Sequence, residues 1–372
     1  MKRIGITGQN GFVGSYLYNT LGLLKEEFIT VPFQKEFFDD PAALQQWVSE
    51  CDVIVHLAAM NRHPDPQVVH DTNIALVEKL IAALDAAGNS PQVIFSSSTQ
   101  EERDNPYGNS KKTGRELLKA WAQRMGAILT GMIIPNVFGP FGKPFYNSVV
   151  ATFCHQLCNG QQPAIDVDGQ LKLIYVGELV TTILTAIREE RNEPEMLLAH
   201  TSEHKVSQIL ECLNRFKEQY FEKGIFPELN DKFELNLFNT FRSFIDHKNY
   251  FPRKFTAHTD ERGMFVELAR VYQYGQSSFS TTRSGITRGN HFHTRKIERF
   301  AVIKGKARIQ LRKHGTDEVL DFELDGSEPA YVDMPVWYTH NITNIGAEEL
   351  YTVFWINEFY DPADPDTYFE TV

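Results

Sequence analysis

A glycine-rich loop close to the first residue restricts most strongly how this chain can fold. The segment Ile4–Gly14 reads IGITGQNGFVG and lies between a short apolar run and an amphipathic stretch. Glycine permits positive φ angles, and closely approaching backbone N–H groups at a helix N-terminus favour a phosphate. We therefore expect a strand, a tight loop and a helix that bind the pyrophosphate of a nucleotide. The expected contacts are Gly8, Gly11, Phe12, Val13 and Gly14.

Short apolar runs alternate with helical stretches through the first 176 residues. The expected strands are Arg3–Thr7, Asp52–Ala59 and Gln92–Ser97. The expected helices are Gly14–Leu24, Asn73–Ala87 and Lys111–Gly126. Such alternation predicts an α/β fold, with a parallel, doubly wound Rossmann sheet that carries helices on both faces. A mainly helical stretch rich in Phe and Leu follows, over residues 175–245.

The sequence pattern changes near residue 247. Beyond it, strands are short and turn signals recur, for example at Ser284–Gly285 and Asp325–Gly326. This pattern is typical of an all-β sandwich or barrel. A chain of 372 residues is long enough for two to three domains. We therefore expect a Rossmann domain over residues 1–246 and an all-β domain over residues 247–372.

Charge and cysteine content restrict the partners. The chain has 37 Lys and Arg against 48 Asp and Glu, a net charge of −11. This balance argues against nucleic acid as a partner, and no apolar run is long enough for membrane insertion. The four cysteines form no paired framework, so reduced thiols in a cytoplasmic protein are expected.

Residues 31–35, where the second strand of a Rossmann sheet would end, bear on cofactor choice. NAD-binding proteins of this fold place an Asp or Glu there for the ribose, whereas this chain has Gln34 and Lys35. A cation suits the 2′-phosphate of NADP. We therefore expect NADPH, with Gln34 and Lys35 among its contacts.

These motifs together resemble the extended short-chain dehydrogenase/reductase family over residues 1–200. The matching segments are Thr7–Gly14, Asp52–Ala59, Asn73 and Pro135–Pro140. The resemblance implies cofactor contacts from Leu57, Ala58, Ala59 and Asn73, and a substrate contact from Asn136. It also implies a catalytic Ser98, Tyr107 and Lys111, with Lys111 contacting the cofactor as well. Only nine positions separate Ser98 from Tyr107, fewer than the family usually has, so Ser97 and Thr99 are alternatives to Ser98.

The pair Tyr107 and Lys111 is the family's Tyr-x-x-x-Lys motif. The spacing of four places both side chains on one helix face. A nearby ammonium stabilises tyrosinate and should lower the pKa of the phenol, which can then exchange a proton with a carbinol. A second match, Tyr250–Lys254, contains Pro252 and is not expected to be helical.

A histidine cluster lies in the second half. Residues 285–305 fit G-x5-H-x-H-x4-E-x6-G, and residues 335–344 fit P-x4-H-x3-N. These are the two motifs of the cupin superfamily, a small β-barrel. Three imidazoles and a carboxylate suit Zn²⁺, Mn²⁺ or Fe²⁺, and we expect Zn²⁺. Four protein ligands leave few open positions on Zn²⁺, which favours structural support over a catalytic role. The expected ligands are His291, His293, Glu298 and His340.

Residues 260–267 and 286–292 also resemble the dTDP-sugar 3,5-epimerases, which are cupins. That resemblance implies that His291 is a catalytic base and that Arg288 contacts the substrate. One ring nitrogen cannot be both base and ligand. The additional His293 and Glu298 favour ligation by His291.

The whole chain resembles the bifunctional CapF/WbjC-type enzymes of capsular polysaccharide biosynthesis. The resemblance implies that the cupin domain epimerises C3 of a UDP-4-keto-6-deoxy-N-acetylhexosamine. The first domain would reduce C4 with NADPH and give UDP-2-acetamido-2,6-dideoxy-L-talose, on the path to UDP-N-acetyl-L-fucosamine. A homodimer is expected. One alternative is a monofunctional ketosugar reductase whose cupin is structural or dimerising. Another is an NADP-binding sensor, against which the presence of Tyr107 and Lys111 argues.

Overall fold

A computed structural model describes residues 1–260, 263–266, 268–269, 271 and 275–372. The chain divides into two compact units, and each is described by itself. Unit 1 contains residues 1–152 and 165–209, and unit 2 contains residues 153–164 and 210–372. In the described part of the chain, no helix is long and apolar enough to cross a bilayer.

Unit 1 is built on a six-stranded sheet in the order β2-β1-β3-β4-β5-β8. Its strands are β1 (Lys2–Thr7), β2 (Phe28–Val31), β3 (Val53–His56), β4 (Gln92–Ser98), β5 (Leu129–Ile134) and β8 (Glu193–Leu197). Every neighbouring pair is parallel. The chain moves outward from β1 in both directions, so the strand order reverses there. In sheets of this type a ligand binds beyond the carboxyl ends of the strands at that switch point.

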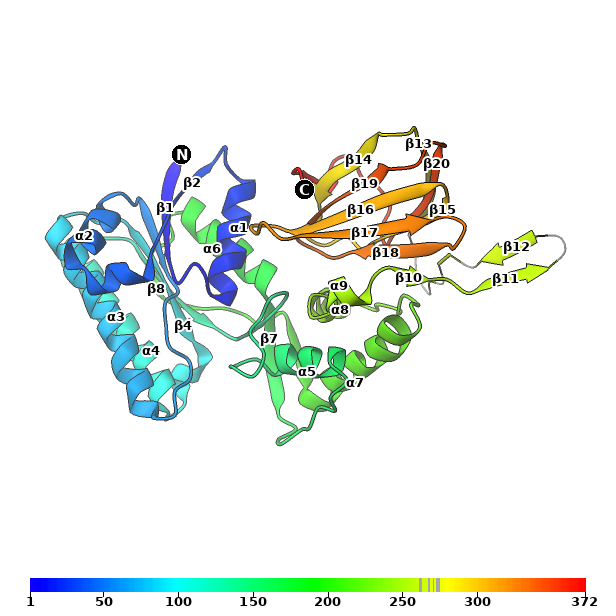
Figure 1. Ribbon diagram of the computed structural model, residues 1–372. Helices are drawn as coiled ribbons and strands as arrows, with labels where there is room; N and C mark the ends of the chain where they lie inside the picture. The colour runs from blue at the N-terminus through cyan, green and yellow to red at the C-terminus, as the bar shows by residue number, and fades with distance from the viewer. Residues whose placement is uncertain (261–262, 267, 270, 272–274) are drawn as a thin grey trace. The chain divides into compact units, whose positions relative to one another are not determined.

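Helices cover both faces of this sheet, as the doubly wound prediction requires. On one face lie α2 (Pro41–Ser49), α3 (Pro66–Ala87) and α4 (Pro106–Met125); on the other lie α1 (Phe12–Leu23) and α6 (Val176–Arg188) (Figure 1). Short 3₁₀ turns, η1 (Lys35–Asp39) and η2 (Thr99–Glu102), precede α2 and α4. The predicted fold class of the first half is confirmed.

Aspartate and asparagine caps set where the helices of unit 1 begin. Asp40, Asp65 and Asn105 each accept hydrogen bonds from first-turn N–H groups of α2, α3 and α4. A proline follows each cap, where its missing N–H costs nothing. The sequence-based starts at Asn73 and Lys111 were therefore wrong, because the Asp65–Pro66 and Asn105–Pro106 signals place the starts earlier.

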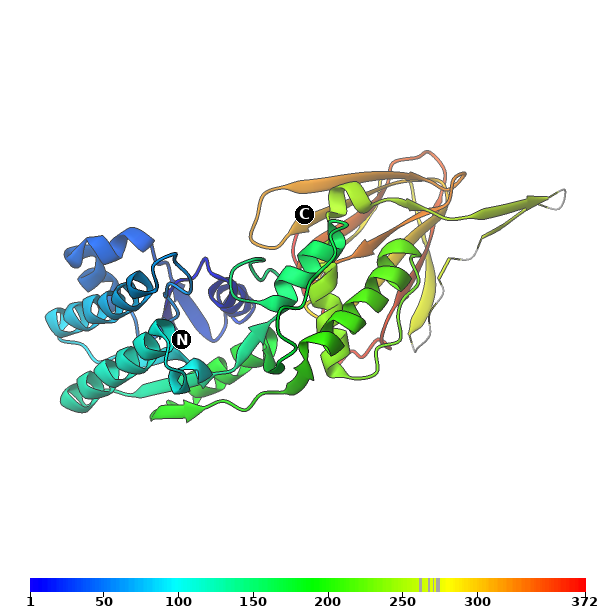
Figure 2. The same ribbon diagram turned by 90° about the horizontal axis from the view of Figure 1, so that it is seen from below.

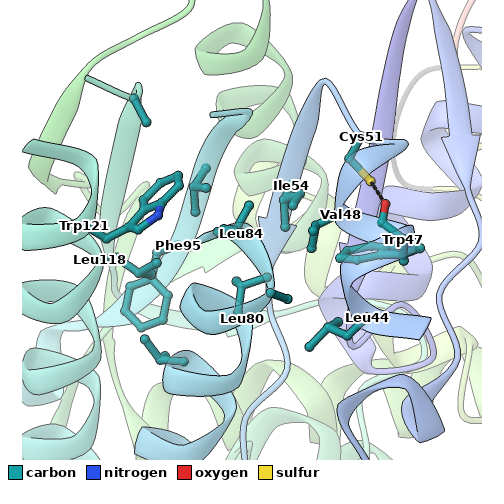
Figure 3. Packing of buried hydrophobic residues seen from close by; sticks show 14 of the residues in the cluster. Leu44, Trp47, Val48, Cys51, Ile54, Leu80, Leu84, Phe95, Leu118 and Trp121 are labelled. Atoms are coloured by element: carbon teal, nitrogen blue, oxygen red, sulfur yellow. Dashed lines mark hydrogen bonds between the residues drawn. The ribbon is translucent and has the colours of Figure 1, made fainter. Parts of the chain in front are cut away.

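The core between the sheet and helices α2 to α4 contains large aromatic side chains. Figure 3 shows Trp47 of α2 and Trp121 of α4 at its two sides, with Phe95 of β4 and Leu80 of α3 between them. The Cys51 thiol donates to the Trp47 carbonyl oxygen at 3.3 Å (Figure 3). Burial of each such side chain contributes about 1.5–3 kcal/mol.

A small second sheet completes unit 1. Its order is β6-β7-β9, with β6 (Asn136–Phe138), β7 (Gln170–Tyr175) and β9 (Ser202–Lys205). The strand β6 is parallel to β7, and β9 is antiparallel to it. The helices α5 (Val149–Cys158) and α7 (Val206–Phe216) each continue from unit 1 into unit 2.

Unit 2 contains two five-stranded antiparallel sheets, seen from two directions in Figures 1 and 2. The first has the order β10 (Arg253–Lys254), β18 (Ala330–Met334), β15 (Glu298–Lys304), β20 (Leu350–Ile356) and β13 (Gln276–Thr282). The second has the order β17 (Val319–Asp325), β16 (Lys306–Lys313), β19 (Tyr338–Asn344), β14 (Thr287–Phe292) and β21 (Tyr368–Phe369). A hairpin, β11 (Ala257–Asp260) and β12 (Gly263–Val266), precedes β13. Apolar residues from both sheets form one buried cluster. The predicted all-β cupin fold is confirmed.

Helical residues up to position 250 pack with these sheets. They form η3 (Lys217–Glu222), a π-helical turn, with α8 (Lys232–Arg242) and α9 (His247–Tyr250). The Tyr220 hydroxyl donates to Asp333 Oδ2 at 2.7 Å, and Arg242 Nη2 donates to the Met334 carbonyl oxygen at 2.9 Å. The change from helices to strands thus lies near residue 247, whereas the compact unit that holds the strands takes in residues from 210 onward.

Candidate active sites

The glycine loop forms a tight cradle at the carboxyl end of β1. Gly8 has a φ of 75°, and the Gly11 N–H donates to the Gly8 carbonyl oxygen at 2.9 Å. A Cβ on Gly14 would lie 2.2 Å from the Gly8 oxygen, and one on Gly8 would lie 2.9 Å from the Ala58 nitrogen. Gly11 is the N-cap of α1, and no described side chain caps that end. The first-turn N–H groups of α1 can therefore bind an anion.

Thr7 joins this loop to the end of β3. The Thr7 carbonyl oxygen accepts from the Leu57 N–H at 3.2 Å, and its Oγ1 accepts from the Ala58 N–H at 3.3 Å. Oγ1 also lies 2.8 Å from His56 Nδ1. Leu57 and Ala58, with Ala59 next to them, are thereby placed beside the glycine loop. Thr7 and His56 were not predicted as site residues, although both lie inside the motifs that indicated the site.

Asn73 holds the segment that follows β3. Its Oδ1 accepts from the Met60 N–H at 2.7 Å, and its Nδ2 donates to the Met60 carbonyl oxygen at 3.0 Å and to Ser110 Oγ at 3.0 Å. The side chain is 4% exposed. Both polar atoms of the amide are bonded within the protein, so the observed role of Asn73 is to position the backbone that flanks the cofactor site.

Gln34 and Lys35 lie where β2 ends and η1 begins, and both are exposed. The neighbouring Phe33 N–H donates to Gln9 Oε1 at 3.2 Å, which links this segment to the glycine loop. The exposed Lys35 therefore lies on a segment that is hydrogen-bonded to the glycine loop.

Tyr107 and Lys111 lie in the first two turns of α4. Lys111 is 3% exposed, and its Nζ donates to the Ser96 carbonyl oxygen at 2.7 Å. Burial lowers the pKa of Lys111 to about 8 and raises the pKa of Tyr107 to about 12. The expected lowering of the Tyr107 pKa was wrong for this structure. Loss of hydration is the largest cause of the raised pKa, although Lys111 Nζ lies 5.9 Å from the tyrosine ring centroid.

The serines at the end of β4 differ in their hydrogen bonds. Ser97 donates to the Glu101 carboxylate, and Ser96 Oγ donates to the His56 carbonyl oxygen at 3.2 Å. Ser98 Oγ accepts from the Gln100 N–H at 3.2 Å and keeps its own hydrogen for another acceptor. This geometry favours Ser98 over Ser97 as a donor to a substrate oxygen. Thr99, the other alternative, is the first residue of η2.

A buried ion pair, not predicted from the sequence, supports this segment. Arg115 Nε and Nη2 lie 3.0 and 2.8 Å from the two carboxylate oxygens of Glu101. The two side chains are 5% and 6% exposed. Arg115 follows Lys111 by four positions, so an inward-facing cation could have been suspected from the helix period. Nothing in the sequence identified its partner.

The loop after β6 lies near the segment that follows β3. The Asn61 N–H donates to the Tyr146 hydroxyl at 3.1 Å, and Arg62 Nη1 donates to the Phe145 carbonyl oxygen at 3.3 Å. After burial, interaction with Tyr146 is the second cause of the raised pKa of Tyr107. Asn136 is exposed on β6, and its Nδ2 donates to the Lys172 carbonyl oxygen at 3.3 Å. Tyr146 was not predicted, since no motif includes it.

The four expected metal ligands converge in unit 2. His291 is the penultimate residue of β14, His293 follows the strand, Glu298 begins β15 and His340 lies on β19. One potential ligand atom from each residue lies within 4.8 Å of those of the others. Glu298 Oε2 is 3.0 Å from His293 Nε2 and 3.2 Å from His340 Nε2. His291 is half-buried, and the other three are buried.

The outer ring nitrogens indicate what this cluster can bind. His293 Nδ1 lies 2.5 Å from the Asp366 carbonyl oxygen, and His340 Nδ1 lies 3.1 Å from that of Tyr338. If each Nδ1 donates, each neutral ring directs its Nε2 lone pair at the Glu298 carboxylate. Within the described residues, neither Nε2 nor Glu298 Oε2 has a hydrogen-bond partner. Lone pairs and a carboxylate at this distance repel each other unless a proton or a metal ion lies between them, so the residues can hold a divalent metal.

Arg288 lies on β14, three positions before His291. Its Nε donates to Thr282 Oγ1 at 3.1 Å and its Nη2 donates to the Thr281 carbonyl oxygen at 3.1 Å. The residue is exposed, so part of the guanidinium can still bind a ligand. Glu261, Arg262 and Glu267 of the epimerase-like motif lie outside the described residues.

The second Tyr-x-x-x-Lys match has a structural role. Tyr250 ends the short α9, and Lys254 lies on β10, so the two are not on one helix. The Tyr250 hydroxyl lies 2.9 Å from the Phe221 carbonyl oxygen and 3.1 Å from that of Tyr220.

Comparison with known proteins agrees with this architecture. Residues 4–198 match the NAD dependent epimerase/dehydratase family. The chain belongs to that family. Residues 258–368 match the polysaccharide biosynthesis C-terminal domain. Both halves are therefore accounted for by separate family models.

Relatives that span both halves are also known. UDP-2-acetamido-2,6-beta-L-arabino-hexul-4-ose reductase of Pseudomonas aeruginosa is 31% identical over 369 residues, 98% of each chain. Capsular polysaccharide assembling protein CapF of Staphylococcus aureus is 32% identical, with full coverage of both chains and a TM-score of 0.64. RMD of Pseudomonas aeruginosa shares the fold of the first half, with 23% identity, a TM-score of 0.52 and coverage of 59% of this chain and 83% of that one. The resemblance to CapF-type enzymes is confirmed. The chain belongs to the sugar-nucleotide epimerase/reductase family of capsular polysaccharide biosynthesis.

Proposed function

We propose that this protein is a bifunctional sugar-nucleotide enzyme that epimerises C3 of a UDP-4-keto-6-deoxy-N-acetylhexosamine and reduces C4 with NADPH. The product would be UDP-2-acetamido-2,6-dideoxy-L-talose. The observation that carries the reductase half is the buried Lys111 beside Tyr107, on the helix that follows β4 of a nucleotide-binding sheet. The name of the Pseudomonas aeruginosa relative describes a reductase of the same substrate class.

The chain's own residues would bind the cofactor, orient the C4 oxygen and supply the proton for the reduction. Gly8, Gly11 and the N-terminus of α1 would hold the pyrophosphate, and Lys35 the 2′-phosphate. NADPH supplies the hydride that C4 receives. Ser98 would donate a hydrogen bond to the C4 oxygen, and Tyr107 would give that oxygen its proton. A Tyr107 pKa of about 12 keeps the phenol protonated at neutral pH, as proton donation in this direction requires.

Lys111 is proposed to act on Tyr107 electrostatically and on the cofactor ribose by hydrogen bonding. Its ammonium is held by the Ser96 carbonyl oxygen at 2.7 Å, so it cannot swing away from the tyrosine. As the proton leaves Tyr107, this fixed cation stabilises the phenolate that forms. Asn136 is proposed to contact the sugar nucleotide.

The cupin half would perform the epimerisation. The 4-keto group acidifies the C3 proton, so that a base can remove it and the enolate can be reprotonated on the other face. His291, His293, Glu298 and His340 would hold Zn²⁺, which supplies positive charge to the cluster and supports the barrel. Arg288 is proposed to bind the diphosphate or the sugar of the substrate.

Reduction in D₂O tests both halves together. Wild-type protein with NADPH and a UDP-4-keto-6-deoxy-N-acetylhexosamine should give a product that NMR shows to carry deuterium at C3. Tyr107→Phe should abolish NADPH oxidation and leave exchange at C3 intact, whereas Tyr360→Phe, at a residue 58% exposed, should resemble wild type. Loss of both activities in Tyr107→Phe would overturn the two-site proposal. Reduction by wild type without deuterium at C3 would favour a reductase with a dimerising cupin.

A further inference from the structure

A segment far along the chain from the cluster contacts it directly. Asp366 is 3% exposed, although Asp361 and Ala363 shortly before it are exposed. Its carboxylate accepts from the N–H groups of Thr294, Arg295 and Lys296 at 2.9–3.1 Å, and from Thr294 Oγ1 at 2.6 Å. Four donors on one buried carboxylate fix its position firmly, because charge-assisted bonds are about twice as strong as neutral ones.

The same residue also contacts a predicted ligand. The Asp366 carbonyl oxygen lies 2.5 Å from His293 Nδ1. Asp366 therefore binds the loop after His293 through its carboxylate and the ring of His293 through its backbone. The second contact holds the hydrogen on Nδ1 and leaves Nε2 directed at Glu298, 3.0 Å away. This is the tautomer and the orientation that metal ligation requires.

Neighbouring residues hold this segment against the strands that carry the ligands. Lys296 Nζ donates to the Pro365 carbonyl oxygen at 2.6 Å. The strand β21 pairs with the end of β14, where Phe369 faces His291 in register. Glu370 accepts from Thr339 Oγ1, next to His340, and lies 3.1 Å from His314 Nδ1. We name residues Asp364–Glu370 the strap.

We propose that the strap closes the metal cluster and that Asp366 is the positioning residue for His293. This inference rests on the proposed metal site. Without the Asp366 carboxylate, three N–H groups lose their acceptor, the strap separates from the loop, and the ring of His293 loses the contact that orients it. Groups of this kind typically contribute 10–100-fold to metal affinity.

Metal binding to the full-length chain tests the proposal without any catalytic assay. Affinity is measured by competition between the protein and a chromogenic chelator for Zn²⁺, and ligand geometry by the visible spectrum of bound Co²⁺. Asp366→Asn should weaken Zn²⁺ binding 10–100-fold and alter the Co²⁺ spectrum. Asp364→Asn is the matched control, because that strap carboxylate is 69% exposed on Arg295, and it should stay within 2-fold of wild type.

A milder variant keeps the test valid if Asp366→Asn does not fold. Thr294→Val removes one of the four donors and leaves the carboxylate in place, and it should weaken Zn²⁺ binding about 3–10-fold with an unchanged circular dichroism spectrum. Unchanged affinity in a folded Asp366→Asn, or in Thr294→Val if Asp366→Asn does not fold, would overturn the role of the strap. A wild-type chain that binds neither metal would overturn the proposed metal site and this inference together. NADPH-dependent reduction is measured in a separate assay, and its outcome does not decide this inference.

Discussion

Removing either member of the buried Glu101–Arg115 pair should destabilise unit 1 by unequal amounts. Arg115 also forms ion pairs with two further carboxylates. Its Nη1 lies 2.8 Å from Glu195 Oε1 and 3.1 Å from Glu116 Oε1, and these two side chains are 54% and 47% exposed. Glu101 has only Ser97 besides Arg115 among the side-chain contacts described. Arg115→Met therefore leaves a buried carboxylate without a cation, at a cost of about 3–5 kcal/mol. Glu101→Gln leaves Arg115 paired and should cost about 1–2 kcal/mol.

The double variant gives the decisive comparison. In Glu101→Gln with Arg115→Met, neither member of the pair is charged, so the double variant should be more stable than Arg115→Met alone by about 1 kcal/mol or more. Hydrogen–deuterium exchange in increasing urea measures the unfolding free energy of β4 and α4 separately from unit 2. Equal costs for the two single variants, or a double variant whose cost equals their sum, would refute the reasoning.

Three further outcomes are expected. Gly14→Ala should weaken NADPH binding, measured by nucleotide fluorescence, at least 10-fold, because its Cβ would lie 2.2 Å from the Gly8 oxygen; Gly22→Ala has no atom within 4 Å and should bind normally. Lys35→Glu should reduce the affinity for NADPH but not for NADH, with unchanged thermal stability. An equal loss of affinity for both nucleotides would contradict a role of Lys35 in 2′-phosphate recognition. Since the pKa of Lys111 is lowered to about 8, kcat/KM should fall as pH rises above about 8, and a flat profile up to pH 10 would contradict an active ammonium.

The pKa of Lys111 also bears on stability. Its folded pKa of about 8 is below its ordinary value of 10.5, so between these values the unfolded chain binds more protons than the folded one. Stability contributed by this group therefore rises with pH through that window. The buried cation costs folding free energy at neutral pH, where the proposed reaction needs it.

Local motifs were sufficient to predict the parts of the sites that are formed within short segments. Gly8, Gly11 and Gly14 lie within seven positions, so their spacing alone indicated the loop. His291, His293 and Glu298 are similarly close. The remaining determinants depend on contacts between residues distant in sequence. Asp366 lies 73 positions from His293, and no spacing rule connects them.

The electrostatic environment of the site residues could also not be predicted from the sequence. The motif places a cation near Tyr107, but only the structure shows that burial raises the pKa of the phenol. The helices after residue 210 illustrate the same limit for packing. Their period was evident, whereas the contacts of Tyr220 with Asp333 and of Arg242 with Met334 decide which unit they join.

The position of Asp366 in the chain has a consequence for biosynthesis. A ribosome makes His291, His293, Glu298 and His340 before it reaches Asp366. If the strap orients His293, a nascent chain with all four ligands already exposed would hold its metal only loosely. Firm retention would begin once residues 364–370 had emerged and docked. Tight metal binding would then come late in the folding of the barrel, after the strap has docked.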